Sequence, residues 1–545
     1  MNILGIHFGH DSNAAIVIDG KIIAAVQEER FNRVKHSADI PLNSIDYCLK
    51  EAQLKVSDLD VIAISGQNIH KDFYRIFINK KEEIESDIPV YINKFISNNK
   101  IKIQSFDHHM CHAACGYCCS YFDNDKVLII VSDGAGDDCS ISIWKGYNGK
   151  LTLLKKYPKT GSMGWFFSNV TEALGWVHGD GEGKTMGLAS YGDFSNSLDK
   201  LKIFSPYYID GQLVKERNYG DVGFLKLKGA YHWHFKDANL IYKLLIQEKI
   251  KREDLACAAQ KILEDEHIKI IKYWIKVTGI NRVVLSGGVF LNIVLNRKIC
   301  DLEEIDKCYI FPNPGDSSLG LGASLCAMLV FSNNYKVDYT PYLGPSFSSK
   351  DIEFILQRNK IKYKKFSSLD CLCKKVAEEL SKDKCVGWFQ GRMEYGPRAL
   401  GNRSILMSPL NPQNRDYINK FVKFREKFRP FCPSILYEEK DKWLKEKEDD
   451  FYMILCFNGK NIDKIPSVVH VDGTLRPQLV RKKDNPLYYR LIKEFKKITG
   501  IGVLLNTSLN IMGEPIVLSP TDAIKCFYST GLDILVMENI LIEKN

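Results

Sequence analysis

The sequence has no run of about 18 apolar residues, the length that a helix needs to cross a bilayer. It also has no low-complexity tract. Its first residues, MNILGIHFGHD, carry polar side chains from position 7 onward, unlike a secretory signal. We therefore expect a cytoplasmic protein that does not interact with membranes.

A strong charge of either sign is also absent. The chain has 75 Lys and Arg and 66 Asp and Glu, which gives a formal charge of +9 over 545 residues. Nucleic-acid-binding proteins usually carry a more strongly basic surface, so we expect no nucleic-acid partner. A mild basic excess suits small anionic substrates such as nucleotides and phosphates.

The 16 cysteines are scattered, and the chain lacks the paired CxxC units of zinc fingers. The densest group lies among small residues and comprises Cys111, Cys115, Cys118 and Cys119. Its spacing fits no common set of zinc ligands, so we interpret these cysteines as packed side chains of a helix in a reducing compartment.

The composition is that of a globular protein, with 45% hydrophobic and 26% charged residues. At ~100–200 residues per domain, the length predicts at least two domains. Helical and strand patterns alternate along the chain, which predicts the α/β class. Residues 332–350 are polar and rich in turn-forming residues, so we predict two domains, 1–342 and 343–545.

Two segments of the first third look alike, residues 3–29 and 127–157. Each has an apolar strand, a Gly/Asp turn, a second strand, an Asp-Gly or Asn-Gly hairpin and a third strand. This predicts a duplicated β-meander, as in the actin-like, ribonuclease-H-like fold, which binds nucleotide between its two copies. A chance recurrence of hairpins is the alternative.

The next part of the chain predicts further elements. Residues 252–277 have helical periodicity and are followed by a strand (RVVLSGG), a helix (VFLNIVLNRKI) and a strand (KCYIFPNPGD). Residues 195–250 are charged and aromatic, with GAYHWHF at 229–235. They form either a lid that touches a substrate or an ordinary amphipathic surface.

A possible metal site begins in the segment SFDHHMCHAACGY, which predicts a helix. His108 and His112 are four residues apart and so project from one helix face. Asp133 and Asp316 each follow a predicted strand. Two imidazoles and two carboxylates suit iron, manganese or zinc, whereas in the alternative interpretation the aspartates only cap turns.

Glycine-rich turns occur at residues 181–192, 285–292 and 315–322. Such turns let the backbone approach a phosphate closely, and a following helix offers free N–H groups. They favour a nucleotide cleft over purely structural turns.

Basic residues gather in the second half among glycines, prolines and aromatics, which favours a fixed phosphate pocket over a solvated surface patch. They are Arg392, Arg398, Arg403, Lys420, Lys423, Arg425, Lys427, Arg429 and Arg476. The segment LNTSLN, with Asn506, Thr507 and Ser508, would complete this pocket.

These motifs are also where the sequence resembles the O-carbamoyltransferases that modify nodulation factors and antibiotics. The resemblance covers nearly the whole chain and is carried by GIHFGHDSNAA, DHHMCHAA, EGKTMGLASYG, LSGGVFLN, PNPGDSSLG, YGPRALGNRSI, KFREKFRPF, HVDGTLRPQ and LNTSLNIMGEPIV. It implies an N-terminal, metal-binding, actin-like transferase domain. It also implies a C-terminal α/β adenylate-forming domain that resembles the threonylcarbamoyl-adenylate synthase fold.

The resemblance implies that ATP, with Mg²⁺, and carbamoyl phosphate yield carbamoyl-adenylate in the C-terminal domain. The residues that match there are Arg398, Lys423, Arg429, Arg476, Asn506 and Ser508. In the N-terminal domain the implied metal ligands are His108, His112, Asp133 and Asp316, for Fe²⁺ in the first place and with Mn²⁺ or Zn²⁺ as alternatives. Gly287, Gly288 and Asn292 would hold the nucleotide, and His10 and Asp11 would activate a hydroxyl of a small-molecule acceptor. The alternative function is tRNA modification or tRNA binding, which the modest charge disfavours.

Overall fold

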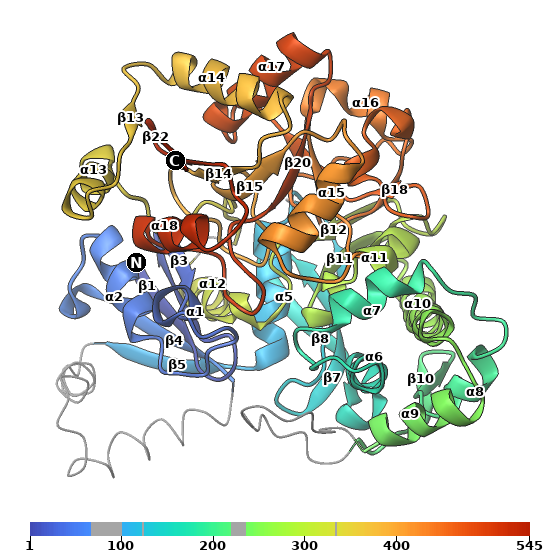
Figure 1. The fold of residues 1–545 in the computed structure, drawn as a ribbon. Helices are drawn as coiled ribbons and strands as arrows, with labels where there is room; N and C mark the ends of the chain where they lie inside the picture. Colours follow the sequence, from blue (N-terminus) through green and yellow to red (C-terminus); the bar gives the residue numbers. More distant parts are fainter. Residues whose placement is uncertain (67–100, 123–124, 220–235, 333–334, 545) are drawn as a thin grey trace. The chain divides into compact units, whose positions relative to one another are not determined.

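The computed structural model describes residues 1–66, 101–122, 125–219, 236–332 and 335–544 (Figure 1). It divides into unit 1, Met1–Glu28 with Ala38–Tyr339, and unit 2, Glu29–Ser37 with Thr340–Asn545. The segment Glu29–Ser37, which the sequence analysis placed in the first domain, thus groups with unit 2. Arg33 in this segment donates hydrogen bonds to the carbonyl oxygens of Pro515 and Ile516, both at 2.7 Å.

Unit 1 contains two five-stranded sheets with the same pattern. The first has the order β3-β2-β1-β4-β5 and the second β8-β7-β6-β11-β12. In each, three antiparallel strands continue into two strands parallel to the first of them. The strands are β1 (Asn2–His7), β2 (Asn13–Ile18), β3 (Lys21–Gln27), β4 (Val61–Ser65), β5 (Lys102–Phe106), β6 (Val127–Ser132), β7 (Cys139–Tyr147), β8 (Lys150–Pro158), β11 (Arg282–Ser286) and β12 (Lys307–Ile310).

The predicted duplication of the β-meander is therefore present. The two hairpin turns, at Asp19-Gly20 and Asn148-Gly149, have positive φ at both central residues. This is the geometry of the type I′ turn, whose twist matches that of the flanking strands.

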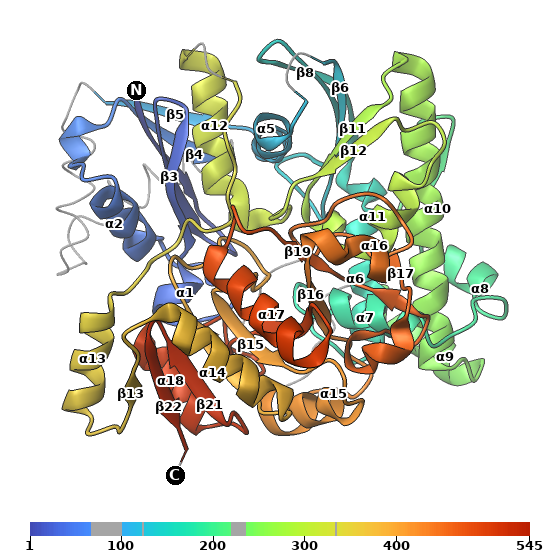
Figure 2. The same ribbon diagram turned by 90° about the horizontal axis from the view of Figure 1, so that it is seen from above.

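Two helices lie between the sheets of unit 1, α5 (His108–Cys119) and α12 (Leu319–Phe331) (Figure 2). Helix α12 contacts β1, β2 and β4, α5 contacts β6 and β11, and the two helices contact each other. The predicted cysteines of α5 are buried free thiols, which agrees with a packed helix. Strand β1 and helix α12 can pack this closely only because residue 5 is glycine. A Cβ on Gly5 would lie 1.9 Å from the carbonyl oxygen of Gly320.

We predict that Gly5→Ala destabilises the protein by about 1–3 kcal/mol, because the new methyl group meets backbone atoms of α12 that cannot rotate away. The matched control is Gly183→Ala, because a Cβ at Gly183 has nothing within 4 Å. Alanine in a helix is favoured over glycine, so the control should unfold at the same or a higher temperature. Equal thermal midpoints for Gly5→Ala and the wild type would contradict this packing.

The remaining elements of unit 1 are α2 (Leu42–Glu51), α6 (Met163–Ala173), α7 (Glu182–Ala189), α8 (Leu198–Lys202), β9 (Tyr207–Ile209), β10 (Gln212–Lys215), α9 (Ala238–Gln247), α10 (Arg252–Thr278) and α11 (Ile293–Cys300). Helix α10 corresponds to the predicted helix at 252–277. The segment 195–250 forms α8, β9, β10 and α9, but its aromatic stretch 229–235 lies outside the described residues.

Unit 2 is built on an eight-stranded sheet with the order β13-β22-β21-β14-β15-β20-β16-β19. Its strands are β13 (Lys364–Lys365), β14 (Val386–Phe389), β15 (Arg403–Met407), β16 (Cys432–Leu436), β19 (Gln478–Val480), β20 (Val503–Ser508), β21 (Ile534–Met537) and β22 (Ile540–Glu543). A separate two-stranded sheet pairs β17 (Phe457–Asn458) with β18 (Thr474–Leu475). The helices are α1 (Glu29–Asn32), α13 (Ser349–Arg358), α14 (Leu369–Ser381), α15 (Gln413–Tyr417), α16 (Lys440–Trp443), α17 (Pro486–Thr499) and α18 (Pro520–Tyr528). A core that includes Trp388, Leu491 and Phe495 joins α14 and α17 to the sheet.

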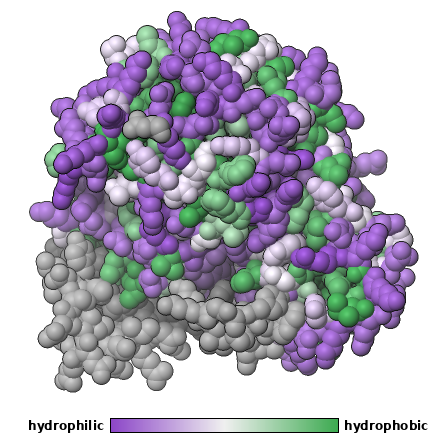
Figure 3. All heavy atoms as spheres, viewed as in Figure 1, coloured by the Kyte–Doolittle hydropathy of each residue, from purple (hydrophilic) through white to green (hydrophobic). Residues whose placement is uncertain are grey.

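Both units mix helices and sheets, which confirms the α/β class. On the face drawn in Figure 3, hydrophobic side chains lie in small groups among hydrophilic ones. Within the described ranges, no helix combines the length and the apolar character that crossing a membrane requires.

Candidate functional site

Helix α5 starts immediately after β5, and two aspartates fix its first turn. Asp107 caps the helix by accepting a hydrogen bond from the backbone N–H of Met110 at 2.9 Å. Asp137, from the loop after β6, accepts one from the backbone N–H of His108, also at 2.9 Å. This capping satisfies free N–H groups at the helix start and fixes the backbone from which both histidines project.

His108, His112, Asp133 and Asp316 form one cluster within unit 1, as the sequence predicts. One ligand atom from each lies within 4.8 Å of the others. The Nε2 atom of His112 is 3.1 Å from Asp133 Oδ2 and 3.2 Å from Asp316 Oδ1. The Nε2 atom of His108 is 3.6 Å and 3.5 Å from the same two atoms.

The cluster is a candidate metal site. His108 Nε2 and Asp133 Oδ2 are buried, and within the described residues each has charged neighbours at 3.1–3.6 Å but no hydrogen bond of good geometry. Burial lowers the pKa of His108, but Asp316 and Asp133 outweigh this effect and raise the pKa to about 10. Burial raises the pKa of Asp316, whereas His108 and His10 hold it well below its usual range. The two carboxylates thus demand a positive charge, which either protons or a metal ion would supply.

His10 and Asp11 lie in the turn between β1 and β2 and reach the same cluster. His10 places Nε2 3.1 Å from Asp316 Oδ2 and Nδ1 2.9 Å from Asp11 Oδ2. Burial lowers the pKa of His10, but Asp316 and Asp11 raise it well above the usual value. The imidazole is therefore held between two carboxylates.

Asn13, which no sequence pattern singled out, holds this region together. Asn13 donates hydrogen bonds to the carbonyl oxygens of Asp11 (2.8 Å) and Asp316 (3.0 Å) and accepts one from the N–H of Gly320 (2.9 Å). It ties the first turn of the first meander to the start of α12. Asn13 lies two residues after Asp11 in the motif GHDSNAA, and this position could have indicated its role.

The predicted nucleotide-binding residues have clear structural roles of their own. A Cβ on Gly287 would lie 2.3 Å from the carbonyl oxygen of Ser132, and one on Gly288 would lie 2.9 Å from Asp133 Oδ1. The N–H of Gly287 donates to Pro314 O at 2.9 Å. The helix predicted directly after these glycines begins later, because a 3-10 turn (Gly288–Leu291) intervenes and Asn292 caps α11.

The side chain of Asn292 already forms hydrogen bonds within unit 1. Its side-chain amide exchanges two hydrogen bonds with that of Gln260 on α10, at 2.7 and 3.1 Å. Nucleotide binding by Gly287, Gly288 and Asn292 therefore stays a prediction.

In unit 2, Lys423 follows a π-helical turn (Ile418–Val422) and is buried. Its ammonium group lies 2.7 Å from Asn510 Oδ1, 2.9 Å from Asn510 O and 3.2 Å from Ser508 Oγ. Burial, with Arg425 and Arg429 nearby, lowers the pKa of Lys423 well below its usual value. Asn510, which the sequence analysis did not select, thus joins Ser508 at this lysine.

The arginines of unit 2 fall into two groups, and the sequence did not distinguish them. Arg392 donates to the carbonyl oxygens of Leu343 and Gly344, and Arg403 to those of Gln390 and Pro345. These two arginines thus have structural contacts of their own, and phosphate binding by them stays a prediction.

The side chains of Arg398 and Arg476, in contrast, have no hydrogen bond or ion pair with another described residue, and Arg476 Nε is buried without a partner. Burial lowers the pKa of Arg476 and Arg398 adds to this effect, whereas Cys432 opposes it, so the two guanidinium groups interact electrostatically. Burial raises the pKa of the Cys432 thiol, while Arg398, Arg476 and Arg425 oppose that rise. Positive charge from three arginines therefore acts on this thiol. Asn506 donates to Ala399 O, in the loop that carries Arg398, at 3.2 Å.

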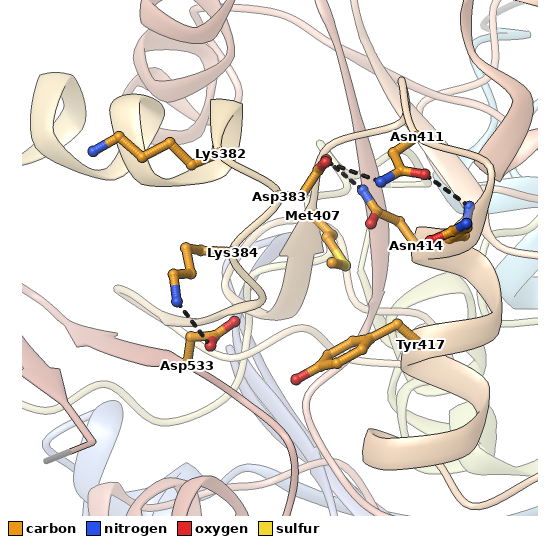
Figure 4. Close-up of a pocket in the computed structure, with 9 residues that line it drawn as sticks. Lys382, Asp383, Lys384, Met407, Asn411, Asn414, Tyr417 and Asp533 are labelled. Carbon is orange, nitrogen blue, oxygen red and sulfur yellow. Dashed lines mark hydrogen bonds and ion pairs between the residues drawn. The ribbon is translucent and has the colours of Figure 1, made fainter.

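A separate cavity of about 280 Å³ in unit 2 contains none of the predicted site residues (Figure 4). Asp383 accepts hydrogen bonds from Asn411 (3.0 Å) and Asn414 (2.7 Å), and Lys384 lies 3.4 Å from Asp533. These polar groups satisfy one another, so we assign no ligand to this cavity.

Comparison with known proteins identifies the family. Residues 2–325 match the family model of the carbamoyltransferase N-terminus, and residues 377–544 match that of the carbamoyltransferase C-terminus. Nodulation protein NolNO of Sinorhizobium fredii is 32% identical over 98% of this chain and 79% of its own length. An uncharacterized protein of Methanocaldococcus jannaschii is 35% identical over 81% of this chain and 74% of its own.

Among solved structures, component A of (R)-2-hydroxyglutaryl-CoA dehydratase from Acidaminococcus fermentans matches 60% of this chain and 97% of its own, with a TM-score of 0.35 and 15% identity. That likeness is too weak to support a conclusion about function. The two family matches, however, cover most of both halves, and the chain therefore belongs to the carbamoyltransferase family and is an enzyme of carbamoyl transfer.

Proposed function

We propose that this enzyme is an ATP-dependent O-carbamoyltransferase that works through carbamoyl-adenylate. Carbamoyl phosphate is first cleaved by water to carbamate and phosphate. A carbamate oxygen then attacks the α-phosphorus of ATP, bound with Mg²⁺, and pyrophosphate leaves. Finally, a hydroxyl oxygen of a small-molecule acceptor, a natural product or glycan, attacks the carbamoyl carbon, and AMP leaves.

The observation that carries this proposal is the pair of unengaged guanidinium groups of Arg398 and Arg476. ATP and carbamoyl phosphate are both polyanions, so a pocket that holds them together must offset their mutual repulsion. Planar guanidinium groups bind phosphate oxygens in a bidentate way, and fixed cations stabilise charge that develops in the transition state. Lys423, Arg429, Asn506 and Ser508 complete this adenylate-forming site.

We assign acceptor carbamoylation to unit 1. His108, His112, Asp133 and Asp316 would hold a transition metal, with iron favoured over manganese or zinc. A metal there would supply Lewis-acid polarisation of oxygen. His10 and Asp11, which lie beside Asp316, are the side chains that we assign to binding and activating the acceptor hydroxyl.

The reaction products test this proposal. Purified enzyme with ATP, Mg²⁺ and carbamoyl phosphate should release AMP and pyrophosphate, measured by chromatography and a pyrophosphate assay. A parallel reaction without carbamoyl phosphate should release neither. Formation of ADP without AMP would contradict the adenylate route.

A further inference from the structure

Arg398 lies in a loop between β14 and β15 whose backbone is unusually constrained. Gly396 and Gly401, on either side of Arg398, have φ values of +135° and +100°, which favour glycine. A Cβ on Gly401 would lie 2.2 Å from the ring of Tyr488. The loop therefore has little freedom to shift without repacking its surroundings.

A single buried carboxylate holds the N–H side of this loop. Glu394 is 2% exposed. Its Oε1 atom accepts hydrogen bonds from the backbone N–H groups of Leu400 (2.6 Å), Asn402 (2.8 Å) and Arg403 (3.3 Å). Its Oε2 atom has no hydrogen-bond partner among the described residues. Hydrogen bonds to a carboxylate are roughly twice as strong as neutral ones, so these three contacts fix the C-terminal half of the loop.

The carbonyl side of the loop is held by four other side chains. Arg30 donates to Gly396 O at 2.9 Å and Asn506 to Ala399 O at 3.2 Å, while Gln478 and Tyr342 both donate to Leu400 O, at 2.8 and 2.9 Å. The backbone on both sides of Arg398 is thus anchored, whereas its guanidinium group has no partner among the described residues. The entropy of ordering this loop is lost on folding rather than on ligand binding, which preorganises Arg398.

We propose that Glu394 is the positioning residue of the adenylate-forming site: by gathering three backbone N–H groups, it holds Arg398 where the phosphate of carbamoyl phosphate binds. This inference rests on the proposed function for the role of Arg398 itself. Glu394 touches no substrate in this assignment and acts through Arg398. A displacement of about 1 Å in a catalytic group can cost on the order of 100-fold in rate.

The test combines two substitutions of Glu394 with Arg398→Ala in the full-length enzyme. Glu394→Ala removes the acceptor and should raise KM for carbamoyl phosphate and lower kcat/KM for AMP formation by about 10- to 100-fold. Glu394→Gln keeps an acceptor at Oε1. Its amide nitrogen replaces Oε2, which has no hydrogen-bond partner among the described residues, so this variant should recover a large part of the loss. The control is Glu379→Ala on α14, since that carboxylate pairs with Lys375 of the same helix and with Lys382 just after it, and it should leave KM unchanged.

The double variant Glu394→Ala/Arg398→Ala should be no slower than Arg398→Ala alone, because coupled residues are not additive. Additive losses would overturn the inference. So would equal hydrogen exchange of residues 396–403 in the wild type and in both Glu394 variants. If the wild type makes no AMP at all, the proposed function fails. The positioning role is then judged by hydrogen exchange and by the thermal shift that carbamoyl phosphate produces.

Discussion

Arg398→Ala is expected to slow AMP formation from ATP and carbamoyl phosphate by roughly 30- to 1000-fold. This range corresponds to about 2–4 kcal/mol of lost transition-state stabilisation, as for one charge-assisted contact to a developing anion. The Arg398 side chain has no partner among the described residues, so its removal breaks no contact within the protein. Lys423→Ala should have a similar effect, because it removes the buried ammonium group beside Ser508 and Asn510. The rates are measured at saturating ATP over a range of carbamoyl phosphate concentrations.

The control for these variants is Arg490→Ala. Arg490 lies on α17, is 43% exposed and pairs with Asp370 at 2.6 Å, so its loss removes a surface charge without touching the site. It should form AMP at the wild-type rate and unfold at nearly the wild-type temperature. If Arg398→Ala kept the wild-type rate, the phosphate pocket would be assigned to the wrong residues.

His112→Ala is expected to lose nearly all bound transition metal and all transfer to an acceptor. The proposed site has only two nitrogen ligands, and His112 supplies one of them from a fully buried position. Wild-type preparations should contain about one metal ion per chain, with iron favoured, as measured by mass spectrometry of the elements. Transfer is followed as the mass gain of a carbamoyl group in a panel of hydroxylated compounds.

A histidine outside the cluster provides the comparison. His178 belongs to unit 1 and pairs with Glu172 at 2.7 Å. His178→Ala should therefore retain the wild-type metal content. If His112→Ala retained it too, the four residues would not be the metal site.

The sequence predicted those parts of the fold that depend on local patterns. The two meanders followed from alternating apolar residues and from Asp19-Gly20 and Asn148-Gly149, because few turns other than type I′ suit such pairs. The shared face of His108 and His112 followed from helical geometry alone. The approach of Asp133 and Asp316 to these histidines depends on how β6 and α12 pack, and the resemblance to a known family supplied it.

Other features depend on tertiary contacts that one sequence does not reveal. Arg392, Arg398 and Arg403 look equivalent in the motif, yet backbone carbonyl oxygens engage the first and third and leave the second unengaged. The assignment of Glu29–Ser37 to unit 2 likewise depends on contacts with residues almost 500 positions away, such as the hydrogen bond from Arg33 to Ile516. Glu394 has no distinctive sequence signal, because its three partners are backbone groups.

The central claim is that carbamoyl-adenylate is made in unit 2 and used in unit 1. The most direct test is the rate of AMP formation by His112→Ala, measured beside Arg398→Ala with ATP and carbamoyl phosphate and without an acceptor. Our account predicts a rate close to that of the wild type for His112→Ala and a loss of roughly 30-fold or more for Arg398→Ala. If a folded His112→Ala enzyme lost AMP formation as completely as Arg398→Ala, the division of the two steps between the units would be wrong.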